Sequence, residues 1–595
     1  MANHFSAELS NEISKWMEWD KNEKTRTEIQ QLVDAHDAQE LKTRMMSRIE
    51  FGTAGMRARM AAGNSVLNDL TIIQATQGLT KHLLASCAGA KKMGVVVGFD
   101  ARYNSQRWSE LTAAVLISQG VPVFLYSRIC PTPYVPFAVK HYGAACGIMI
   151  TASHNPKEDN GYKVYWTNSA QIISPTDKEI SKAIRENLAP WEDSWNTELA
   201  QTNLRKDPYA EIYQKYNERL LTTCISKASN SSAPTLTYTA MHGVGYHYIQ
   251  EAFRVAGFAQ PIPVKEQVEP DPDFPTVKYP NPEEGKGALL LSMKTAEQND
   301  SRVILANDPD ADRLAIAEQQ PNGEWKIFTG NEIGALLGWW CWQRFRKQNP
   351  DVPSSDVYML ASTVSSKILR SIGDVEGFNF IETLTGFKWM GNKAFELMGN
   401  GKHVPFAFEE AIGFMVGTEV LDKDGISAAV NAGELVNELY KNGSSLTQQL
   451  KEIYSKYGYH LSSNSYFICH DKNTIRKMFE NIRNSGKYPT SCGPYKIRHV
   501  RDLTDEGYDS SKPDFKPDLP TSSSQMITFT FENGCVTTLR TSGTEPKIKY
   551  YTEHVPDKSK GMDKEEATNE LNDIVENIIK HFFQPEKNGL IPKSD

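Results

Sequence analysis

Short apolar runs rich in β-branched residues alternate along this chain with longer amphipathic segments. Such runs are typical of strands buried in a sheet, and the segments between them are typical of helices. The runs lie at 93–98, 121–125, 147–150, 303–305 and 356–360, and the segments include 68–86, 109–119 and 332–348. The alternation predicts α/β domains whose sheets are covered by helices on both faces.

The pattern changes after residue 446, where strands are predicted at 526–531 and 535–539 and a helix at 564–582. This part of the chain is predicted to be an α+β domain. We therefore expect four domains, at 1–205, 206–320, 321–445 and 446–595. Two polar stretches, 226–234 and 510–525, are predicted to be surface loops.

Composition places the chain among soluble globular proteins. Hydrophobic residues make up 39% of its 595 residues, which is enough for each domain to bury a core. Apolar stretches fall short of the roughly 18–20 residues that span a bilayer, and the N-terminus lacks the apolar segment of a secretory signal. The eight cysteines are scattered without a C-x-x-C pair, which fits a reducing compartment. We expect a cytoplasmic protein.

The charge balance argues against polyanionic partners. With 65 basic and 73 acidic residues the net charge is −8, which gives no general attraction for nucleic acid. We expect neither a nucleic-acid nor a membrane partner. An anionic substrate would need local clusters of positive charge.

The first candidate chemical loop is Thr151-Ala-Ser-His-Asn-Pro-Lys157, directly after a predicted strand. A serine at the carboxyl end of a strand lies at the edge where α/β sheets bind ligands. A phosphate on Ser153 would meet positive charge from His154 and Lys163. The same residue types also cap helices or form polar turns. The G-x-S-x-G elbow of acyl-transfer enzymes is absent here.

The second candidate loop is Asp308-Pro-Asp-Ala-Asp-Arg313, which follows the predicted strand at 303–305. Three carboxylates at alternate positions around a bend converge on one hard cation, and the remaining coordination positions suit Mg²⁺ shared with a phosphate oxygen. A calcium EF-hand is excluded because Arg313 stands where glycine is needed. An aspartyl phosphatase of the haloacid dehalogenase type and a solvated acidic turn remain as alternatives.

The third candidate region combines three short stretches of Gly, Lys and acidic residues. They are Thr385-Gly-Phe-Lys388, Phe408-Glu-Glu-Ala-Ile-Gly413 and Leu421-Asp-Lys-Asp-Gly425. A carboxylate such as Glu409 accepts hydrogen bonds from two sugar hydroxyls, and Lys388 and Lys423 would meet a phosphate oxygen. Gly386 and Gly391 have P-loop spacing, but the Lys-[Ser/Thr] that must follow is missing. An ordinary surface turn has similar residues.

The fourth candidate loop is Arg540-Thr-Ser-Gly-Thr-Glu-Pro-Lys547, after the predicted strand at 535–539. Small hydroxyl residues and a glycine in a tight turn point N–H groups and hydroxyls at one spot, which forms an anion-binding nest. Arg540 and Lys547 flank it, and an arginine fork suits a phosphate dianion. A plain turn has the same composition.

Together the four loops supply a serine nucleophile, a divalent cation site, hydroxyl recognition and a phosphate clamp. Phosphoryl transfer needs these functions, because it depends chiefly on positioning and charge neutralisation. The chain carries no recognisable nucleotide loop. A transfer in which a serine phosphate is both donor and acceptor requires none, so the combination predicts a phosphotransferase of that kind.

The sequence resembles the α-D-phosphohexomutase superfamily, whose members carry T-A-S-H-N-P, D-x-D-x-D-R, G-E-x-S and R-x-S-G-T loops in this order. F-G-T-A-G-M-R at 51–57, D-N-G-Y-K-V-Y at 159–165 and F-E-E-A-I-G resemble its phosphoglucomutase-2 or phosphopentomutase branch. The resemblance runs from about residue 48 to the C-terminal helix. It implies four domains in a heart-shaped arrangement, namely three related α/β domains with mixed sheets and a C-terminal α+β domain like TATA-binding protein.

The resemblance also implies residue roles. The implied metal ligands are Ser153, Asp308, Asp310 and Asp312. The implied catalytic residues are Ser153, His154, Lys163 and Arg57. The implied substrate-binding residues are Arg57, Arg313, Thr385, Gly386, Lys388, Glu409, Lys423, Arg540, Ser542, Gly543, Thr544 and Lys547. For proton transfer Lys163 is the first candidate and His154 the second, although a lysine base needs a lowered pKa.

The implied activity is that of an isomerase, an intramolecular phosphotransferase. It would interconvert glucose 1-phosphate and 6-phosphate, or (deoxy)ribose 1-phosphate and 5-phosphate, through phospho-Ser153 and a bisphosphate intermediate. Mg²⁺ would be the cofactor, glucose 1,6-bisphosphate the priming activator, small phosphosugars the partners, and the protein a monomer or weak dimer. Ala411 stands where many relatives have serine, which favours the branch that also accepts pentoses. A glucose-1,6-bisphosphate synthase, an aspartyl phosphatase and a non-catalytic phosphosugar sensor remain as alternatives.

Overall fold

The first sheet is mixed and contains three of the predicted strands. The computed structural model describes residues 5–52, 55–542, 546–557 and 561–593. The strands, in the order β1-β5-β4-β2-β3-β6, are β1 (Gly55–Arg59), β5 (Asp159–Tyr165), β4 (Cys146–Ile150), β2 (Val95–Phe99), β3 (Val123–Leu125) and β6 (Arg205–Lys206). β5 pairs antiparallel with β1 and β4, and the β4–β2, β2–β3 and β3–β6 pairs are parallel.

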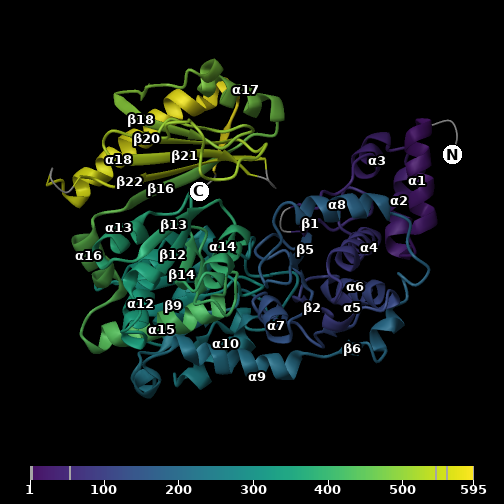
Figure 1. Cartoon of the computed structure of the whole chain (residues 1–595), viewed down its shortest axis with the longest axis horizontal. Coiled ribbons are helices and arrows are strands. Elements are labelled where there is room, and N and C mark those ends of the chain that lie inside the picture. The colour runs from purple at the N-terminus through teal and green to yellow at the C-terminus, as the bar shows by residue number, and fades with distance from the viewer. Residues whose placement is uncertain (1–4, 53–54, 543–545, 558–560, 594–595) are drawn as a thin grey trace. The chain divides into compact units, whose positions relative to one another are not determined.

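Helices pack on this sheet as the alternating pattern predicts (Figure 1). They are α4 (Asp69–Ser86), α5 (Ala90–Met93), α6 (Ser105–Ser118), α7 (Tyr134–Tyr142) and α8 (Thr176–Glu186). Both α6 and α7 contact β2 and β4, while α4 packs on α6 and α8. The strands that they cover are fully buried, which explains their continuous apolar runs.

Three short helices precede the first sheet. They are α1 (Ala7–Trp19), α2 (Glu23–Asp34) and α3 (Ala38–Met45). Each begins after a polar residue whose side chain accepts a hydrogen bond from the helix backbone, namely Ser6, Asn22 and Asp37. Their apolar faces meet around Trp16 and contact Leu70 at the start of α4. The three helices are therefore anchored to the first α/β domain.

The second sheet has the strand order β11-β10-β9-β7-β8. Its strands are β7 (Leu236–Thr239), β8 (Ile262–Pro263), β9 (Val303–Ala306), β10 (Ala315–Gln319) and β11 (Trp325–Ile327). The helices α9 (Tyr209–Leu220), α10 (Gly245–Ala256) and α11 (Lys286–Gln298) accompany it, and α11 packs on β7, β8 and β9. Since β11 pairs with β10, this sheet extends past residue 320, where the sequence places a domain boundary.

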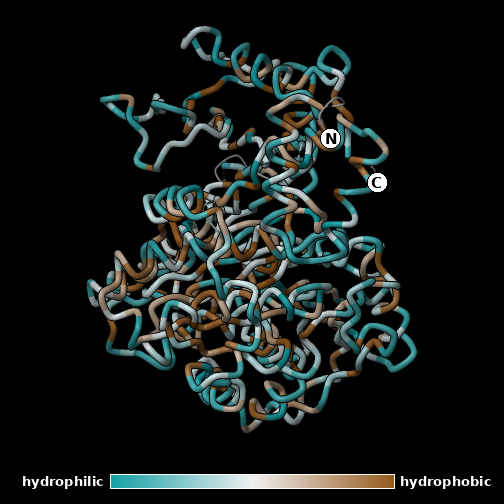
Figure 2. Tube along the Cα trace, turned by 90° about the vertical axis from the view of Figure 1, so that its right-hand side faces the viewer, coloured by the Kyte–Doolittle hydropathy of each residue, from teal (hydrophilic) through white to brown (hydrophobic). Residues whose placement is uncertain are grey.

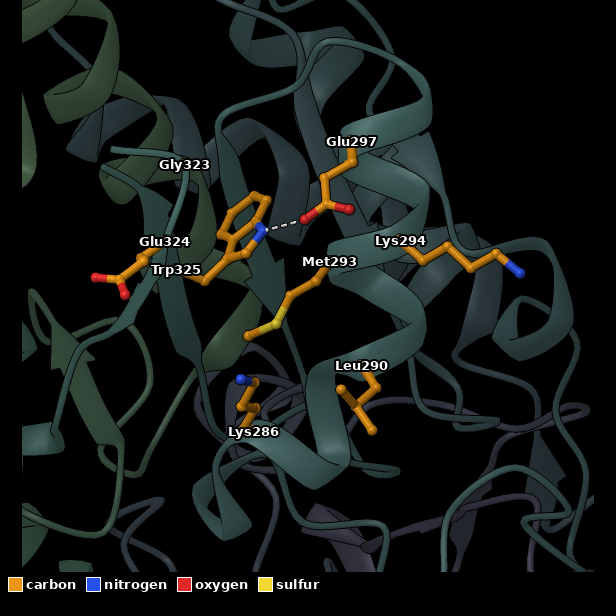
Figure 3. A pocket seen from close by; sticks show the side chains of 8 residues that line it. All are labelled: Lys286, Leu290, Met293, Lys294, Glu297, Gly323, Glu324 and Trp325. Atoms are coloured by element: carbon orange, nitrogen blue, oxygen red, sulfur yellow. Dashed lines mark hydrogen bonds between the residues drawn. The ribbon is translucent and has the colours of Figure 1, made fainter. Parts of the chain in front are cut away.

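A cavity of about 470 Å³ lies between α11 and the β10–β11 hairpin (Figure 3). Its lining residues are Lys286, Leu290, Met293, Lys294, Glu297, Gly323, Glu324 and Trp325. One wall is held by the Trp325 indole N–H, which donates to Glu297 Oε1 at 2.8 Å. These lining residues include no member of the four candidate loops, so the predicted chemistry does not reside in this cavity.

Two further strands and two helices complete the first of two compact units. The strands β14 (His403–Glu409) and β15 (Gly413–Val416) form an antiparallel pair, and the helices are α14 (Phe387–Gly399) and α15 (Gly425–Lys441). This unit comprises Met1–Ile333, Trp340–Pro350 and Gly386–Leu446. The long helix α12 (Gly330–Gln348) contributes residues to both units.

The second unit comprises Gly334–Trp339, Asp351–Thr385 and Thr447–Asp595. Its first part holds the parallel pair β12 (Val357–Ser362) and β13 (Asn379–Thr383) with α13 (Ile368–Glu376) between them in sequence, and α16 (Leu446–Tyr457) leads into its second part. There an antiparallel sheet has the order β17-β18-β20-β21-β22-β16-β23. The strands are β16 (Leu461–Ile468), β17 (Ser491–Cys492), β18 (Tyr495–Asp502), β20 (Met526–Phe531), β21 (Cys535–Thr541), β22 (Lys547–His554) and β23 (Ile591–Pro592), and β19 (Tyr508–Asp509) pairs with β18.

The C-terminal sheet has its own core. Residues from α17 (Lys472–Arg483) and α18 (Lys564–Ile578) pack on apolar residues of β20 and β21. The predicted α+β character of this domain is confirmed. Coloured by hydropathy, the chain carries hydrophobic stretches within its packed layers and hydrophilic stretches along its outer loops (Figure 2). Among the described residues, no helix has both the length and the apolar character needed to span a bilayer.

Candidate active site

The loop that follows β4 presents Ser153. This residue is 2% exposed and adopts a left-handed backbone conformation, with φ of 55°. Its N–H donates to Thr151 Oγ1 at 2.9 Å, which fixes the turn. The Ser153 hydroxyl donates to Asp308 Oδ2 at 2.8 Å and lies 3.3 Å from His154 Nδ1. Two loops that are 155 positions apart in the sequence are thus brought together.

The aspartate loop follows β9 and buries all three carboxylates. Asp308, Asp310 and Asp312 are 0% exposed, and one oxygen of each lies within 4.8 Å of the others. Within the part of the chain that the structure describes, Asp310 Oδ1 and Asp312 Oδ1 are buried and accept no hydrogen bond. A buried carboxylate oxygen without a donor is unfavourable. Three converging carboxylates, two of them with such an oxygen, fit a hard divalent cation.

Two lysine side chains contact the aspartate loop. Lys163 Nζ, from β5, lies 2.7 Å from Asp310 Oδ2 and 3.0 Å from Asp312 Oδ2. Lys423 Nζ lies 3.2 Å from Asp312 Oδ2. The two lysines therefore occupy Oδ2 atoms and leave the Oδ1 atoms of the same carboxylates for another ligand.

Burial and neighbouring charges act differently on Asp308 and Asp310. Burial, followed by the charges of Asp310 and Asp312, raises the pKa of Asp308 well above its ordinary value. Burial also opposes ionisation of Asp310, but Lys163 holds the pKa of this carboxyl below its ordinary range. The fold therefore disfavours the ionised form of Asp308 and favours that of Asp310.

The two candidates for proton transfer differ in charge. Although burial favours the neutral amine, Asp310 and Asp312 raise the pKa of Lys163, so it is a cation and lacks the lowered pKa that a base requires. Burial, followed by the charges of Arg313 and Arg57, lowers the pKa of His154 well below its ordinary value. A neutral imidazole 3.3 Å from Ser153 Oγ favours His154 over Lys163 as proton acceptor. This order reverses the one predicted from the sequence.

Several predicted sugar-site residues also lie in the first unit. Glu409, at the end of β14, accepts a hydrogen bond from the N–H of Gly386. Burial and then the charge of Glu410 raise the pKa of Glu409 to about 7. Arg313 Nη1 donates to the carbonyl of Ala411 at 3.2 Å, so the aspartate loop directly contacts the stretch that carries Glu409.

Arg57 and Lys388 contact different parts of the chain. Arg57, on β1, donates through Nη1 to Asn155 Oδ1 at 3.1 Å and thus contacts the Ser153 loop. Lys388, on α14, has its Nζ 5.9 Å from the centre of the Trp389 ring. Arg57 therefore contacts the Ser153 loop, and its role, like that of Lys388, stays a prediction.

The predicted phosphate clamp lies in the second unit. Arg540, near the end of β21, donates through Nη1 to Thr385 Oγ1 at 2.5 Å, which brings two predicted substrate residues together. The N–H of Ser542 donates to the carbonyl of Lys547 at 2.9 Å. Lys547 Nζ lies 4.4 Å from the centre of the Tyr466 ring. Gly543 and Thr544 lie outside the described residues.

Two site residues were not predicted from the sequence. Thr132 donates through Oγ1 to Asp310 Oδ2 at 2.6 Å, across 178 positions that a single sequence does not connect. Asp422 accepts hydrogen bonds from Tyr165 Oη at 2.7 Å and Gln171 Nε2 at 2.9 Å, and it lies 3.2 Å from Lys423 Nζ. It stands within the stretch 421–425 that the sequence singled out, so its proximity to Lys423 was the available signal.

Three family models match successive parts of the chain. They are described as phosphoglucomutase/phosphomannomutase, alpha/beta/alpha domains I, II and III, and they match residues 48–190, 214–323 and 329–457. The chain belongs to the phosphoglucomutase/phosphomannomutase family. The predicted superfamily and the three related α/β domains are thereby confirmed.

Individual members of the phosphoglucomutase/phosphomannomutase family cover nearly the whole chain. A human protein named phosphopentomutase is 54% identical over 99% of this chain and 98% of its own length. A human protein named glucose 1,6-bisphosphate synthase is 53% identical over 99% of this chain and 96% of its own length. The solved open form of parafusin, a phosphoglucomutase from Paramecium, has a TM-score of 0.65 at 18% identity and covers 91% of this chain and 96% of that chain, which supports the fold.

Proposed function

We propose that this family member is a phosphosugar mutase that carries its transferable phosphate on Ser153. The observation that supports this most directly is the position of the Ser153 hydroxyl, 2.8 Å from Asp308 Oδ2 and 3.3 Å from His154 Nδ1. A hydroxyl held between a carboxylate cluster and a neutral imidazole is suited to accept and release a phosphoryl group.

The proposed transfer has two half-reactions. A hydroxyl oxygen of the sugar monophosphate attacks the phosphorus on Ser153, a new O–P bond forms, the P–Oγ bond breaks, and the hydroxyl proton is transferred to Oγ through the site. The bisphosphate then reorients. In the return step Ser153 Oγ attacks the other phosphate group, a new Oγ–P bond forms, and the P–O bond to the sugar breaks. The Ser153 proton passes through His154 or Asp308, the two acceptors that Oγ faces, and ends on the sugar oxygen that leaves.

The chain's own residues prepare this site before substrate arrives. Asp308, Asp310 and Asp312 would hold Mg²⁺ together with a phosphate oxygen on Ser153, and the ion would neutralise charge on the transferred group. Lys163 and Lys423 fix the carboxylates through their Oδ2 atoms. Arg57 reaches the Ser153 loop and would contact the moving phosphoryl group.

We propose that the substrates are (deoxy)ribose 1- and 5-phosphates together with glucose 1- and 6-phosphates, with glucose 1,6-bisphosphate as primer. Ala411 and the similarity to a phosphopentomutase support pentoses. Glu409, Arg540 and Lys547 would bind sugar hydroxyls and the phosphate that is not transferred. We further propose a monomer or weak dimer in the cytoplasm that acts on small phosphosugars without nucleic-acid or membrane partners, and the four-domain division given above.

The equally similar glucose 1,6-bisphosphate synthase makes bisphosphate synthesis the second candidate function. The two activities use the same phosphoserine but differ in phosphoryl donor and in release of the intermediate. Supplying 1,3-bisphosphoglycerate separates them, because a synthase releases glucose 1,6-bisphosphate into solution whereas a mutase returns the monophosphate isomer. Relative rates with glucose 1-phosphate and deoxyribose 1-phosphate then rank the sugars.

The decisive variant is Ser153→Ala. It should lower mutase turnover by at least about 1,000-fold, because no other side chain replaces the nucleophile. Intact-mass spectrometry after incubation with glucose 1,6-bisphosphate should show one added phosphate on the wild-type chain and none on the variant. Ser14→Ala, on the exposed face of α1, is the matched control and should behave as wild type. Near-normal turnover of Ser153→Ala would overturn the proposal.

A further inference from the structure

The loop that carries Ser153 closes around one buried guanidinium group. Arg102 Nη2 donates to the carbonyl oxygens of Ser153 and Asn155, at 2.6 and 2.7 Å. Its Nη1 donates to the carbonyl oxygens of Pro156 and Asp159, at 2.8 and 3.2 Å. The Arg102 side chain is 1% exposed. Four backbone carbonyls of one loop therefore converge on a single side chain.

The remaining N–H of Arg102 faces a carboxylate. Asp100 Oδ2 lies 3.3 Å from Arg102 Nε, while Asp100 Oδ1 accepts from the Arg102 N–H at 3.0 Å and from Ser105 Oγ at 2.7 Å. A guanidinium has five N–H donors in a planar fork, and here the four terminal ones meet carbonyls. Lysine has three donors and no fork, so it cannot reproduce this pattern.

The loop adopts a conformation that needs such support. Ser153 has a φ of 55°, in the left-handed region that is unfavourable for residues with a Cβ atom. In this conformation its hydroxyl reaches Asp308 at 2.8 Å. Asn155, whose carbonyl Arg102 also holds, accepts a hydrogen bond from Arg57 at 3.1 Å. Contacts from Arg102 thus reach both the nucleophile and the arginine beside it.

Phe274, from the second α/β domain, packs against the Arg102 guanidinium. The Phe274 ring centre lies 5.0 Å from Arg102 Cζ, and Phe274 is 4% exposed. The neighbouring Asp273 accepts a hydrogen bond from Tyr103 Oη at 2.9 Å and pairs with Lys157 at 3.0 Å. An arginine over an aromatic face, shielded from water, is a favourable cation–π contact.

We propose that Arg102 is a positioning residue that holds the 151–159 loop in the conformation that aims Ser153 Oγ at Asp308, with Phe274 as its support. The proposal rests on the proposed function, since the loop matters for turnover only if Ser153 carries the phosphate. Arg102 does not touch the reacting atoms and acts through the backbone of the loop.

The experiment compares Arg102→Lys, Arg102→Ala and Phe274→Leu in the full-length protein. Arg102→Lys keeps the charge but loses the fork, and kcat should fall about 100-fold, the scale of a misplacement of about 1 Å. KM should change less than about threefold, because the sugar contacts are elsewhere. Amide hydrogen exchange should accelerate within residues 151–161 only. Free guanidinium ion should restore part of the turnover of Arg102→Ala, and Phe274→Leu should show a smaller loss of kcat.

The control is Arg128→Lys, because Arg128 also stacks on an aromatic ring, 4.4 Å from Tyr209, without contacting the loop. It should leave kcat and loop exchange unchanged. Arg102→Lys with kcat within twofold of wild type, or with reduced kcat but unchanged loop exchange, overturns the proposal. If Arg102→Ala does not fold, kcat and loop exchange of Arg102→Lys and Phe274→Leu test the proposal. A wild-type protein without turnover or phosphoserine would instead sink the proposed function, and loop exchange would still test the role of Arg102.

Discussion

Two sites with carboxylates shielded from solvent differ in the direction in which the fold shifts the carboxyl pKa. In the first unit, burial and neighbouring aspartates raise the pKa of Asp308 well above its ordinary value. In the second unit, burial opposes ionisation of Glu382, but Lys367 and Arg501 lower its pKa to about 2. The Glu382 carboxylate lies 3.2 Å from Lys367 Nζ and 2.7 Å from Arg501 Nη2, and its side chain is 13% exposed.

This difference in pKa shift distinguishes a candidate ligand site, the aspartate loop, from a structural ion-pair cluster around Glu382. Glu382 has two cations for one carboxylate, so its charge is satisfied within the fold. Asp310 and Asp312 share Lys163, and each retains a buried Oδ1 that accepts no hydrogen bond from the described residues. Such an unfavourable arrangement persists where it serves function, and an added cation relieves it. We infer that the aspartate loop is under electrostatic strain until it binds its ligand.

Among the variants that test this comparison, Asp308→Asn should have the largest effect. Loss of one ligand charge should reduce turnover at least about 100-fold, because the cation would be held by two carboxylates. In the presence of a chelator, however, the variant should be at least as stable as wild type, since the like-charge repulsion is removed. Mg²⁺ at 100 times its Kd should then stabilise wild type by about 2.7 kcal/mol and the variant by less. Thermal unfolding with and without Mg²⁺ measures both effects.

Asp514→Asn, in a polar surface loop, is the matched control for Asp308→Asn and should change neither activity nor the response to Mg²⁺. A clear loss of stability of Asp308→Asn in chelator would show that the cluster is not strained. Equal Mg²⁺ stabilisation of variant and wild type would remove Asp308 from the metal site.

The reverse outcome is expected for Glu382→Gln. Two cations would lose their carboxylate, and the second unit should lose about 2 kcal/mol of stability, while phosphorylation of Ser153 stays near wild type. The folded pKa of about 2 lies below the ordinary 4.5, so this contribution is present above pH 4.5 and is lost as pH falls through 2. Unfolding midpoints of both proteins should therefore converge in acid.

Glu480→Gln, in an exposed pair with Arg476 at 3.6 Å, is the control for Glu382→Gln and should cost less than about 0.5 kcal/mol. Equal losses for the two glutamine variants would show that the Glu382 cluster adds nothing beyond a surface ion pair. Loss of Ser153 phosphorylation in Glu382→Gln would place that cluster in the catalytic machinery.

The sequence was most informative where strands end. The Ser153 and Asp308 loops both follow buried apolar runs, and the carboxyl ends of such strands are where α/β sheets bind ligands. Motif and position therefore indicated the same residues. The strands themselves were predicted because both faces are buried, which makes their apolar runs continuous.

Contacts that depend on tertiary packing were beyond the sequence. The position of Thr132 beside Asp310 and of Arg102 inside the Ser153 loop follow from how distant segments pack. The charge of Lys163 depends on the two carboxylates that it faces, so its unsuitability as a base required distances and burial. The pairing of β11 with β10 likewise lies past a boundary that local composition placed at residue 320.

The smallest effect is expected for Glu409, which shows whether a raised carboxyl pKa marks function outside the aspartate loop as well. Burial, then the charge of Glu410, raises the pKa of Glu409 to about 7, so the carboxylate that would accept sugar hydroxyls is lost as pH falls through 7. The apparent KM of wild type should rise up to about tenfold between pH 8 and 6. The KM of Glu409→Gln should lack this pH dependence. The variant's profile also gives the part of the KM change that comes from titration of the substrate phosphate.

Glu409 also affects stability. Because its folded pKa exceeds the ordinary 4.5, the group stabilises the fold below pH 4.5, and this contribution is lost as pH rises through 7. Glu409→Gln should therefore unfold at a higher temperature than wild type at pH 8 while binding sugar more weakly. Parallel KM profiles would assign Glu409 to structure, as for Glu382, whereas diverging profiles would assign it to the strained class of Asp308.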